Sequence, residues 1–264
     1  MSLRFACLTT VAPGRSLAEQ CDAIAASGCT GAETIIFNDT PLDAWVKEFA
    51  GATSTAGLAP AVVILGGLAL YRPGQTTWIR EALAVVAEVG AAALVTPEYR
   101  MQEPLPLFPP FATPAPDEAE HVATALLDIA EQCARLGVAL HLEPITQFEG
   151  RFWRTLDQVT PIAAQLHAAT GATVGVVADF HNMNITEANP VLAMQKAGAA
   201  VTHVHLADNN RRLPGAGHID FAAGLHALAT QDYDGWCSFE CAVDEDFVGA
   251  VSAAIARLQA MRHR

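Results

Sequence analysis

Two histidines and an aspartate close an apolar run in the segment HVHLADNNRRLPGAGHIDF, residues 203–221. His203 and His205 are two positions apart, so in a strand they point to the same face. Asp208 follows, and then come two arginines and a loop with two glycines. A strand end with a purely structural role does not need so many titratable groups. This segment is therefore a candidate for a metal site that holds a polar substrate.

Carboxylates end the neighbouring apolar runs as well. Glu143 ends VALHLE, Asp179 ends TVGVVAD, and Glu240 ends WCSFE. A carboxylate inside apolar sequence is costly to bury unless it is paired or bound to a cation. Because consecutive runs each contribute such a group, we expect one divalent metal ion to be bound by Glu143, Asp179, His205 and Glu240. This oxygen-rich set favours Mn²⁺, with Mg²⁺, Co²⁺ and Zn²⁺ as the alternatives.

Two further groups lie on the same runs but need another interpretation. His203 is farther from the strand end than His205, and we expect it to be a hydrogen-bonded histidine of the core. Glu33, in GAETIIF, is expected to be satisfied in the core or to support the metal ligands. We do not expect it to be a catalyst.

Apolar runs alternate with helix-like segments along the whole chain. A unit of strand, helix and two loops averages 33 residues, because eight such units share 264 residues. No glycine fingerprint of a dinucleotide site follows the first run. We predict an α/β protein with a single (β/α)8 TIM barrel over residues 1–264, in which reactive side chains lie at the carboxyl ends of the strands. The strands are expected at residues 4–11, 31–37, 60–67, 92–99, 138–146, 173–180, 201–208 and 236–243.

Capping patterns predict where several of the eight expected helices begin. Ser16 with Glu19, Asp117 with Glu120, and Thr155 with Gln158 each have the spacing of a capping box. The last helix is expected from about Asp244.

Composition excludes some classes of function. The net charge is −13, with only 15 lysines and arginines, which argues against a nucleic-acid partner. We see no secretory signal at the N-terminus and no apolar stretch of the roughly 18 residues that a membrane span requires. The six cysteines form no CxxC pair and are expected to be reduced. We therefore expect a cytoplasmic protein without a membrane partner.

One segment interrupts the alternation. Residues 103–116 read EPLPLFPPFATPAP and contain six prolines and two phenylalanines. The segment follows the fourth predicted strand and so should rise on the catalytic face of a barrel. Its stiffness and apolar tips predict a substrate wall or a subunit contact.

The segments LEPITQFEG, DFHNMNI, HVHLADNNRRLPGAGHIDF and FECAV resemble the xylose isomerase-like barrels, a family of sugar isomerases and epimerases. Within it, the chain resembles the D-tagatose and D-psicose 3-epimerases, and hydroxypyruvate isomerase is a near relative. These motifs lie in the C-terminal half, while the alternation covers the whole chain. The resemblance implies a sugar or keto-acid substrate and assembly into a homodimer or homotetramer.

The resemblance also implies roles for individual residues. Glu143 and Glu240 match the two acid/base carboxylates as well as two of the four metal ligands, and Glu149 and Arg211 match substrate-binding residues. The family usually places histidine three residues after the metal-binding aspartate. Here Asn182 has that position and the histidine, His181, comes one residue earlier. Both are expected to contact substrate, although an asparagine cannot carry a proton near neutrality.

The predicted reaction is proton transfer next to a carbonyl. The metal acts as a Lewis acid for the enediolate that forms when a C–H proton leaves. One glutamate removes the proton and the other returns one from the opposite face, which favours C3 epimerisation of a ketose. The alternatives are a metal-dependent lyase or dehydratase acting on a keto-sugar or keto-glycoside, hydroxypyruvate isomerase, and a non-enzymatic metal-binding barrel. An apurinic endonuclease is disfavoured, because no histidine precedes His121.

Overall fold

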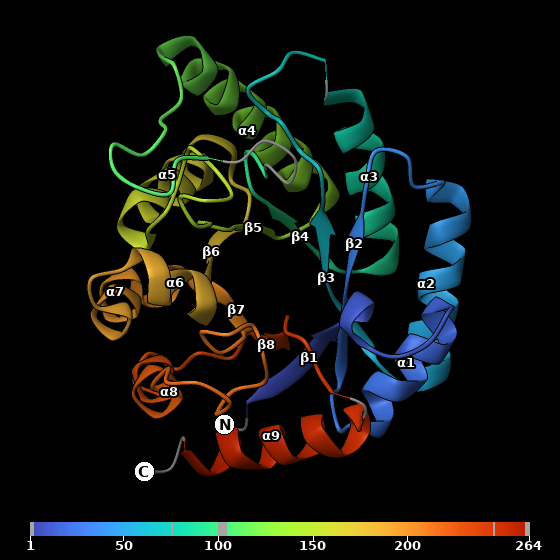
Figure 1. The fold of residues 1–264 in the computed structure, drawn as a ribbon. Helices are drawn as coiled ribbons and strands as arrows, with labels where there is room; N and C mark the ends of the chain where they lie inside the picture. The colour runs from blue at the N-terminus through green and yellow to red at the C-terminus, as the bar shows by residue number, and fades with distance from the viewer. Residues whose placement is uncertain (1–2, 75, 100–104, 245, 262–264) are drawn as a thin grey trace.

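A computed structural model describes residues 3–74, 76–99, 105–244 and 246–261. Eight parallel strands pair in chain order, and the last pairs with the first to close a barrel (Figure 1). This confirms the predicted (β/α)8 fold. The strands are β1 Arg4–Leu8, β2 Gly31–Ile36, β3 Ala59–Leu65, β4 Ala92–Val95, β5 Leu140–Leu142, β6 Val174–Asp179, β7 Val201–Leu206 and β8 Trp236–Phe239.

Helices cover the outside of the barrel (Figure 1). The described residues hold nine α-helices instead of the eight predicted, because two helices, α6 and α7, separate β6 from β7. The helices are α1 Leu17–Ala26, α2 Leu42–Ala56, α3 Thr76–Val89, α4 Pro116–Leu136, α5 Leu156–Thr170, α6 Phe180–Thr186, α7 Pro190–Ala197, α8 Phe221–Ala229 and α9 Phe247–Met261. Short 3-10 turns span Thr9–Val11 and Gly198–Ala200.

All eight strands end earlier than predicted, because the chain leaves the ladder where the loops at the carboxyl ends of the strands begin. Glu143 and Glu240 each lie one residue past their strands. Their backbone N–H groups still donate to the neighbouring strands, at 3.1 Å to the carbonyl of Val95 and 3.3 Å to that of Leu206. The parallel register therefore extends far enough to fix the positions of both glutamates.

The predicted helix starts are partly correct. The Ser16 hydroxyl accepts from the N–H of Glu19 at 3.3 Å and caps α1. The expected start at Asp117 is wrong, because Pro116 has the first helical position, which its fixed φ suits. The Glu118 carboxylate then accepts from the N–H of Ala115 at 2.8 Å.

The starts of α5 and α9 also differ in detail from the prediction. Thr155 does precede α5, but its hydroxyl makes no capping bond. Instead, the Gln158 side chain accepts from the N–H of Arg154 at 2.8 Å. The last helix begins at Phe247, three residues after the expected position.

The apolar side chains form two clusters. The larger one lies between the strands and the surrounding helices. The smaller one lies inside the barrel on β1, β3, β4 and β6, and along β3 its side chains alternate with those of the outer cluster. Its buried members are Leu8, Val62, Ile64, Leu94 and Val177.

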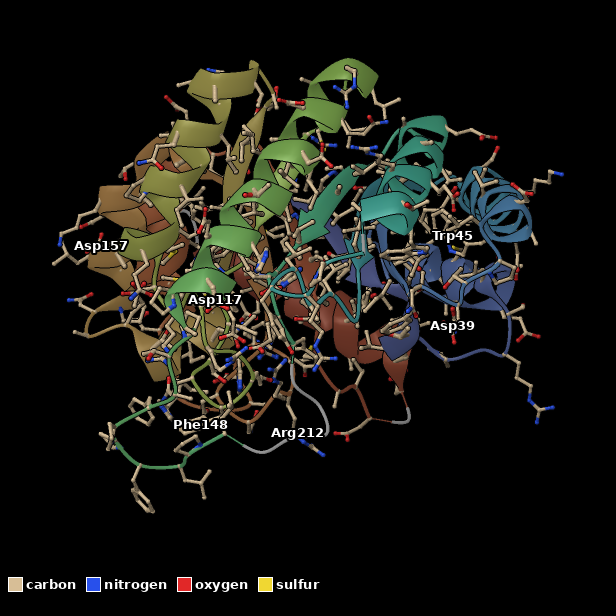
Figure 2. All side chains as sticks on the ribbon, turned by 90° about the horizontal axis from the view of Figure 1, so that it is seen from above. Asp39, Trp45, Asp117, Phe148, Asp157 and Arg212 are labelled. Atoms are coloured by element: carbon tan, nitrogen blue, oxygen red, sulfur yellow. The ribbon has the colours of Figure 1, made fainter. Side chains whose placement is uncertain are left out.

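The loops at the carboxyl ends of the strands form one rim of the molecule. Figure 2 shows Phe148, in the loop after β5, and Arg212, in the loop after β7, at this same end. The described part of the proline-rich segment, residues 105–116, projects beyond it, while residues 103 and 104 lie outside the described residues. Among the described residues, no helix has the length and apolar character needed to cross a membrane.

Candidate active site

Four side chains converge where β5, β6, β7 and β8 end. One ligand atom from each lies within 4.8 Å of the others, although no two of the four are neighbours in sequence. Metal–oxygen bonds of about 2.0–2.6 Å place donors on opposite sides of one ion about 4–5 Å apart, so this spacing fits a single cation. The structure thus brings together the four predicted ligands, Glu143, Asp179, His205 and Glu240.

The two nitrogens of the buried His205 ring face different partners. Nε2 lies 2.8 Å from Glu33 Oε1, while Nδ1 lies 2.9 Å from Glu143 Oε1 and 3.3 Å from Glu240 Oε2. A proton on Nε2 that is donated to Glu33 leaves the Nδ1 lone pair directed at the carboxylate cluster. This is the arrangement of metal-bound histidines, whose other nitrogen donates to a carboxylate.

Glu33 also holds His203, as expected for a residue that supports the site. Its second oxygen lies 3.0 Å from His203 Nε2, and both side chains are fully buried. Glu33, His203 and His205 could by spacing form a second metal site. We favour hydrogen bonding there, because each Glu33 oxygen meets one ring nitrogen at hydrogen-bond length and none of these three residues lines the cavity described below.

Asp179 is oriented by the helix that follows it. Its Oδ1 accepts from the N–H groups of His181 at 2.7 Å and Asn182 at 3.1 Å, which caps α6. The other oxygen, Oδ2, lies 4.0 Å from His205 Nδ1. Oδ1 therefore caps the helix, and Oδ2 is available to bind a cation.

The electrostatics of the cluster indicate that it needs a positive charge. Burial and the nearby carboxylates raise the pKa of Glu143, and they raise that of Glu240 to about 8. Burial opposes a charge on His205, but Glu33, Glu240 and Glu143 outweigh it and raise the pKa of the ring well above its usual range. Three carboxylates around one imidazole are thus poorly compensated, and a divalent ion with oxygen preference fits this donor set.

A cavity of about 330 Å³ lies over the cluster. Glu143 and Glu240 line it, so a ligand in this cavity would contact both glutamates. The other lining residues are Leu8, Thr10, Ile35, Phe37, Ile64, Leu65, Gly66, Gly67, Thr96, Tyr99, Ile145, Glu149, Asn182 and Arg211.

Glu149 and Arg211, both predicted to bind substrate, meet in this cavity. The Arg211 guanidinium donates to Glu149 Oε1 at 3.0 Å, and the Tyr99 hydroxyl lies 3.4 Å from the same oxygen. The Thr146 hydroxyl donates to Glu149 Oε2 at 2.7 Å. The two predicted residues therefore form one polar wall rather than two separate contacts.

Asp208 shapes the loop that carries Arg211. Its buried carboxylate accepts from four backbone N–H groups of that loop, at 2.8–3.2 Å. Burial disfavours its charge, but these donors outweigh burial and lower the pKa. Within the loop, Arg211 has a φ of +57°, a region that non-glycine residues rarely adopt. The Asp208 anchor therefore holds a strained backbone that aims Arg211 into the cavity.

Two polar atoms at the cavity have no hydrogen-bond partner within the described part of the chain. They are the side-chain oxygens of Asn182 and Thr96. A buried polar atom without a partner is costly, and a ligand hydroxyl can satisfy it. Asn182, predicted to bind substrate, is thus well placed to do so.

His181 lies differently from Asn182. It is buried, its Nδ1 lies 3.0 Å from the backbone carbonyl of Asp208, and it does not line the cavity. A hydrogen bond there would connect α6 to the Arg211 loop. Its direct contact with substrate remains a prediction, whereas the structure shows a supporting position.

No motif in the sequence indicated a role for Tyr99, Thr96 or Thr10. Tyr99 and Thr96 lie in TPEY, just after β4, where a barrel places site residues. Their position after a strand was the one sequence feature that suggested a place in the site, because no charged residue pattern accompanies them.

A second network supports this part of the rim. The Arg151 guanidinium donates to the carboxylates of Glu98 at 2.8 Å and Glu118 at 2.8 Å. The N–H of Arg151 also donates to Glu98 at 3.0 Å. These bonds join the loops after β4 and β5, which carry Tyr99 and Glu149.

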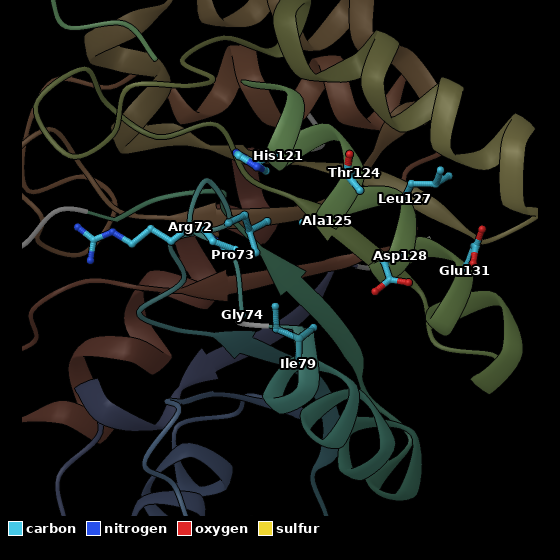
Figure 3. A pocket seen from close by; sticks show the side chains of 11 residues that line it. Arg72, Pro73, Gly74, Ile79, His121, Thr124, Ala125, Leu127, Asp128 and Glu131 are labelled. Carbon is cyan, nitrogen blue, oxygen red and sulfur yellow. The ribbon is translucent and has the colours of Figure 1, made fainter. Parts of the chain in front are cut away.

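Another hollow, of about 400 Å³, lies between the β3–α3 loop, α3 and α4 (Figure 3). Its Arg72 side chain points away from Asp128 and Glu131 (Figure 3). Among the described residues, no group in this hollow has the spacing of a metal site. The chemistry-bearing residues therefore gather in the smaller cavity.

Comparisons with known proteins agree with the barrel fold. A family model described as a xylose isomerase-like TIM barrel matches residues 21–262. A solved structure of a 3-keto-D-glucoside 4-epimerase from Escherichia coli superposes with a TM-score of 0.82 at 24% identity, covering 98% of this chain and 99% of that one. At this identity the superposition supports the fold alone.

Two curated relatives are epimerases. The 3-dehydro-D-guloside 4-epimerase of Escherichia coli is 29% identical over 164 residues, which is 61% of this chain. The L-ribulose 3-epimerase of Mesorhizobium japonicum is 32% identical over 127 residues, which is 48% of this chain. The aligned parts span only 61% and 42% of the length of these two relatives.

Proposed function

The chain belongs to the xylose isomerase-like TIM barrel family, and on that basis we propose that it is a divalent-metal-dependent epimerase of keto-sugars. One observation carries the proposal: the carboxylates of Glu143 and Glu240 lie beside His205 Nδ1 and line one cavity. Two carboxylates at one ligand site are what proton removal and return at a single carbon require.

In the proposed reaction, Glu143 or Glu240 takes a proton from the carbon next to a ketone. The electron pair of the broken C–H bond forms a double bond to the carbonyl carbon, the π pair of the carbonyl moves onto its oxygen, and the substrate becomes an enediolate. The other glutamate then returns a proton to that carbon from the opposite face, so the configuration inverts. A divalent ion held by the four ligands would supply Lewis-acid stabilisation of the developing negative charge.

The remaining polar residues position the substrate. Arg211 and Asn182 offer hydrogen bonds to substrate oxygens, and Glu149 holds Arg211 in place. The relatives' reactions agree with this chemistry. A 3-epimerase of L-ribulose and a 4-epimerase of a 3-dehydro-guloside both invert the carbon next to a ketone. Of these two reactions, the sequence favours C3 epimerisation of a ketose, and we propose epimerisation next to the ketone of a keto-glycoside as the second candidate.

The proposal includes Mn²⁺ as the bound ion and a homodimer or homotetramer as the assembly. The described tip of the proline-rich segment supports a subunit contact, because Leu107 and Phe108 are 70% and 79% exposed. Metal analysis of the purified protein and light scattering test these two points.

The reaction is tested by deuterium exchange. The protein is loaded with Mn²⁺ and incubated in D₂O with a panel of ketoses and keto-glycosides. The metal is then chelated, and NMR locates the deuterium. We expect deuterium at the carbon next to the ketone, together with the inverted product. An enone product would instead identify elimination, and no exchange on any compound would contradict the proposal.

A further inference from the structure

The cavity over the carboxylate cluster has two chemically different sides. On the β4–β8 side, most lining residues carry charged, hydroxyl or amide groups. On the β1–β3 side, Thr10 is the one described lining residue with a polar side chain. The rest of that side, called here the apolar wall, consists of Leu8, Ile35, Phe37, Ile64, Leu65, Gly66 and Gly67.

Several side chains of the apolar wall pack against the barrel interior. Leu8 and Ile64 belong to the cluster that fills the barrel interior, and Ile35 packs against that cluster. Phe37, at the rim, is 40% exposed, so its ring is available to a ligand. Gly66 leaves room for these side chains, because a Cβ there would lie 2.7 Å from the Phe37 ring and 2.8 Å from the Ile35 side chain.

A free ketose gains less from the apolar wall than a glycoside does. It has an oxygen on every carbon of its backbone, so some hydroxyls would face the apolar wall without hydrogen-bond partners, at a cost in free energy. A glycoside differs, since one end of the molecule is an aglycone that need not carry hydroxyl groups. Burial of such a group against the wall is favourable in proportion to its apolar area.

We propose that the apolar wall binds the apolar aglycone of a keto-glycoside, while the carboxylate side binds its oxidised sugar ring. This inference deepens the proposed function and rests on it, because the ketone must still lie beside Glu143 and Glu240. The wall begins in the same cavity that these two carboxylates line, so one ligand can contact both sides.

A binding experiment tests the wall without requiring turnover. The Mn²⁺-loaded full chain is titrated calorimetrically with methyl β-D-glucoside and phenyl β-D-glucoside, which have the same ring and different aglycones. We expect the phenyl glucoside to bind at least about tenfold more tightly, since a phenyl ring adds several buried carbons. Equal affinities would overturn the proposal.

Variants test which residue is responsible for the preference for the phenyl glucoside. Phe37→Ser should reduce the phenyl-to-methyl ratio toward one, while Phe37→Leu should retain most of it. Phe108→Ser is the matched control, because Phe108 is 79% exposed and does not line the cavity. Circular dichroism and the melting temperature check that each variant is folded. If the ratio survives Phe37→Ser, the apolar wall is not the binding surface and the proposal fails.

Turnover separates this inference from the proposed function. The same two glycosides, oxidised at C3, and a free ketose are incubated with the protein in D₂O. Faster exchange on the phenyl compound supports both proposals. Exchange that is as fast on the free ketose and the methyl compound as on the phenyl compound supports the epimerase and overturns the aglycone inference. A phenyl preference in binding, without exchange on any ketone, supports the wall and overturns the epimerase.

Discussion

The two sides of the cavity differ in how their side chains are held. On the β5–β8 side, most functional groups have a polar partner that fixes their direction, such as the α6 backbone for Asp179 and Glu149 for Arg211. On the β1–β3 side, side chains such as Ile35 and Ile64 are held by packing on the barrel interior.

This difference separates two tasks. Hydrogen bonds and ion pairs set direction and protonation, which proton transfer requires. Packing sets shape, which is sufficient to select an inert part of a substrate. Glu33 is the exception, because it comes from β2 and yet supports His205 through the barrel interior. The following predictions test whether the two sides act separately.

The largest effect is expected from removing either acid/base carboxylate. Glu143→Gln and Glu240→Gln should each lower the rate of C–H exchange by about 10²- to 10⁴-fold, because an amide cannot accept the proton. The measurement is deuterium incorporation into substrate with saturating metal. Glu120→Gln, at an exposed position on α4, is the control and should leave the rate unchanged. A near-native kcat in either cavity variant would refute the two-base mechanism.

The next largest effect is expected at Glu33, which lies on β2 but supports the ligand His205 on β7. Glu33→Gln should weaken Mn²⁺ binding by roughly 10- to 100-fold, because loss of a carboxylate behind a histidine ligand typically has this effect. Gln can accept from only one of the two rings that Glu33 meets. Competition with a chelator measures the affinity. Asp39→Asn removes an exposed carboxylate after the same strand and should have no effect (Figure 2). Unchanged affinity in Glu33→Gln would argue against the assignment of His205 Nδ1 as the ligand atom.

Two adjacent arginines offer a matched pair within the polar side. Arg211→Ala should lower kcat/KM by about tenfold or more, since hydrogen bonds to charged groups contribute about 1.5–3 kcal/mol. Arg212→Ala should change it by less than about twofold, because Arg212 pairs with the exposed Asp244 and surface pairs contribute little. Steady-state kinetics on one keto-sugar compares them. Equal losses would mean that the loop as a whole, not the Arg211 guanidinium, is needed.

The smallest effect is expected on the apolar side. Gly66→Ala should displace the Phe37 and Ile35 side chains and reduce the preference for a phenyl aglycone by roughly two- to tenfold, the range set by modest side-chain strain. Calorimetry with the two glucosides measures it. Gly51→Ala, where an added Cβ would meet nothing within 4 Å, is the control. A preference that survives Gly66→Ala unchanged would show that the wall tolerates rearrangement.

Much of the fold could be predicted from the sequence, because alternating apolar runs and helical segments leave few topologies. The ligand set could be proposed for a related reason. Glu143, Asp179 and Glu240 each follow an apolar run, and parallel strands place such ends on one rim. The ends of the elements were less predictable. The start of α4 depended on Pro116 and Glu118, and α6 forms where Asp179 caps a short helix directly after its strand.

The sequence by itself determined the barrel and which strand ends carry charge, because both follow from local patterns of period and residue type. Only the tertiary structure decided which nitrogen of His205 faces the carboxylates, since that depends on Glu33, 172 positions away. It also decided that Arg211 meets Glu149 and that β1–β3 contribute an apolar wall. These features arise from the closure of the barrel, which brings distant strands around one cavity and which no local pattern records.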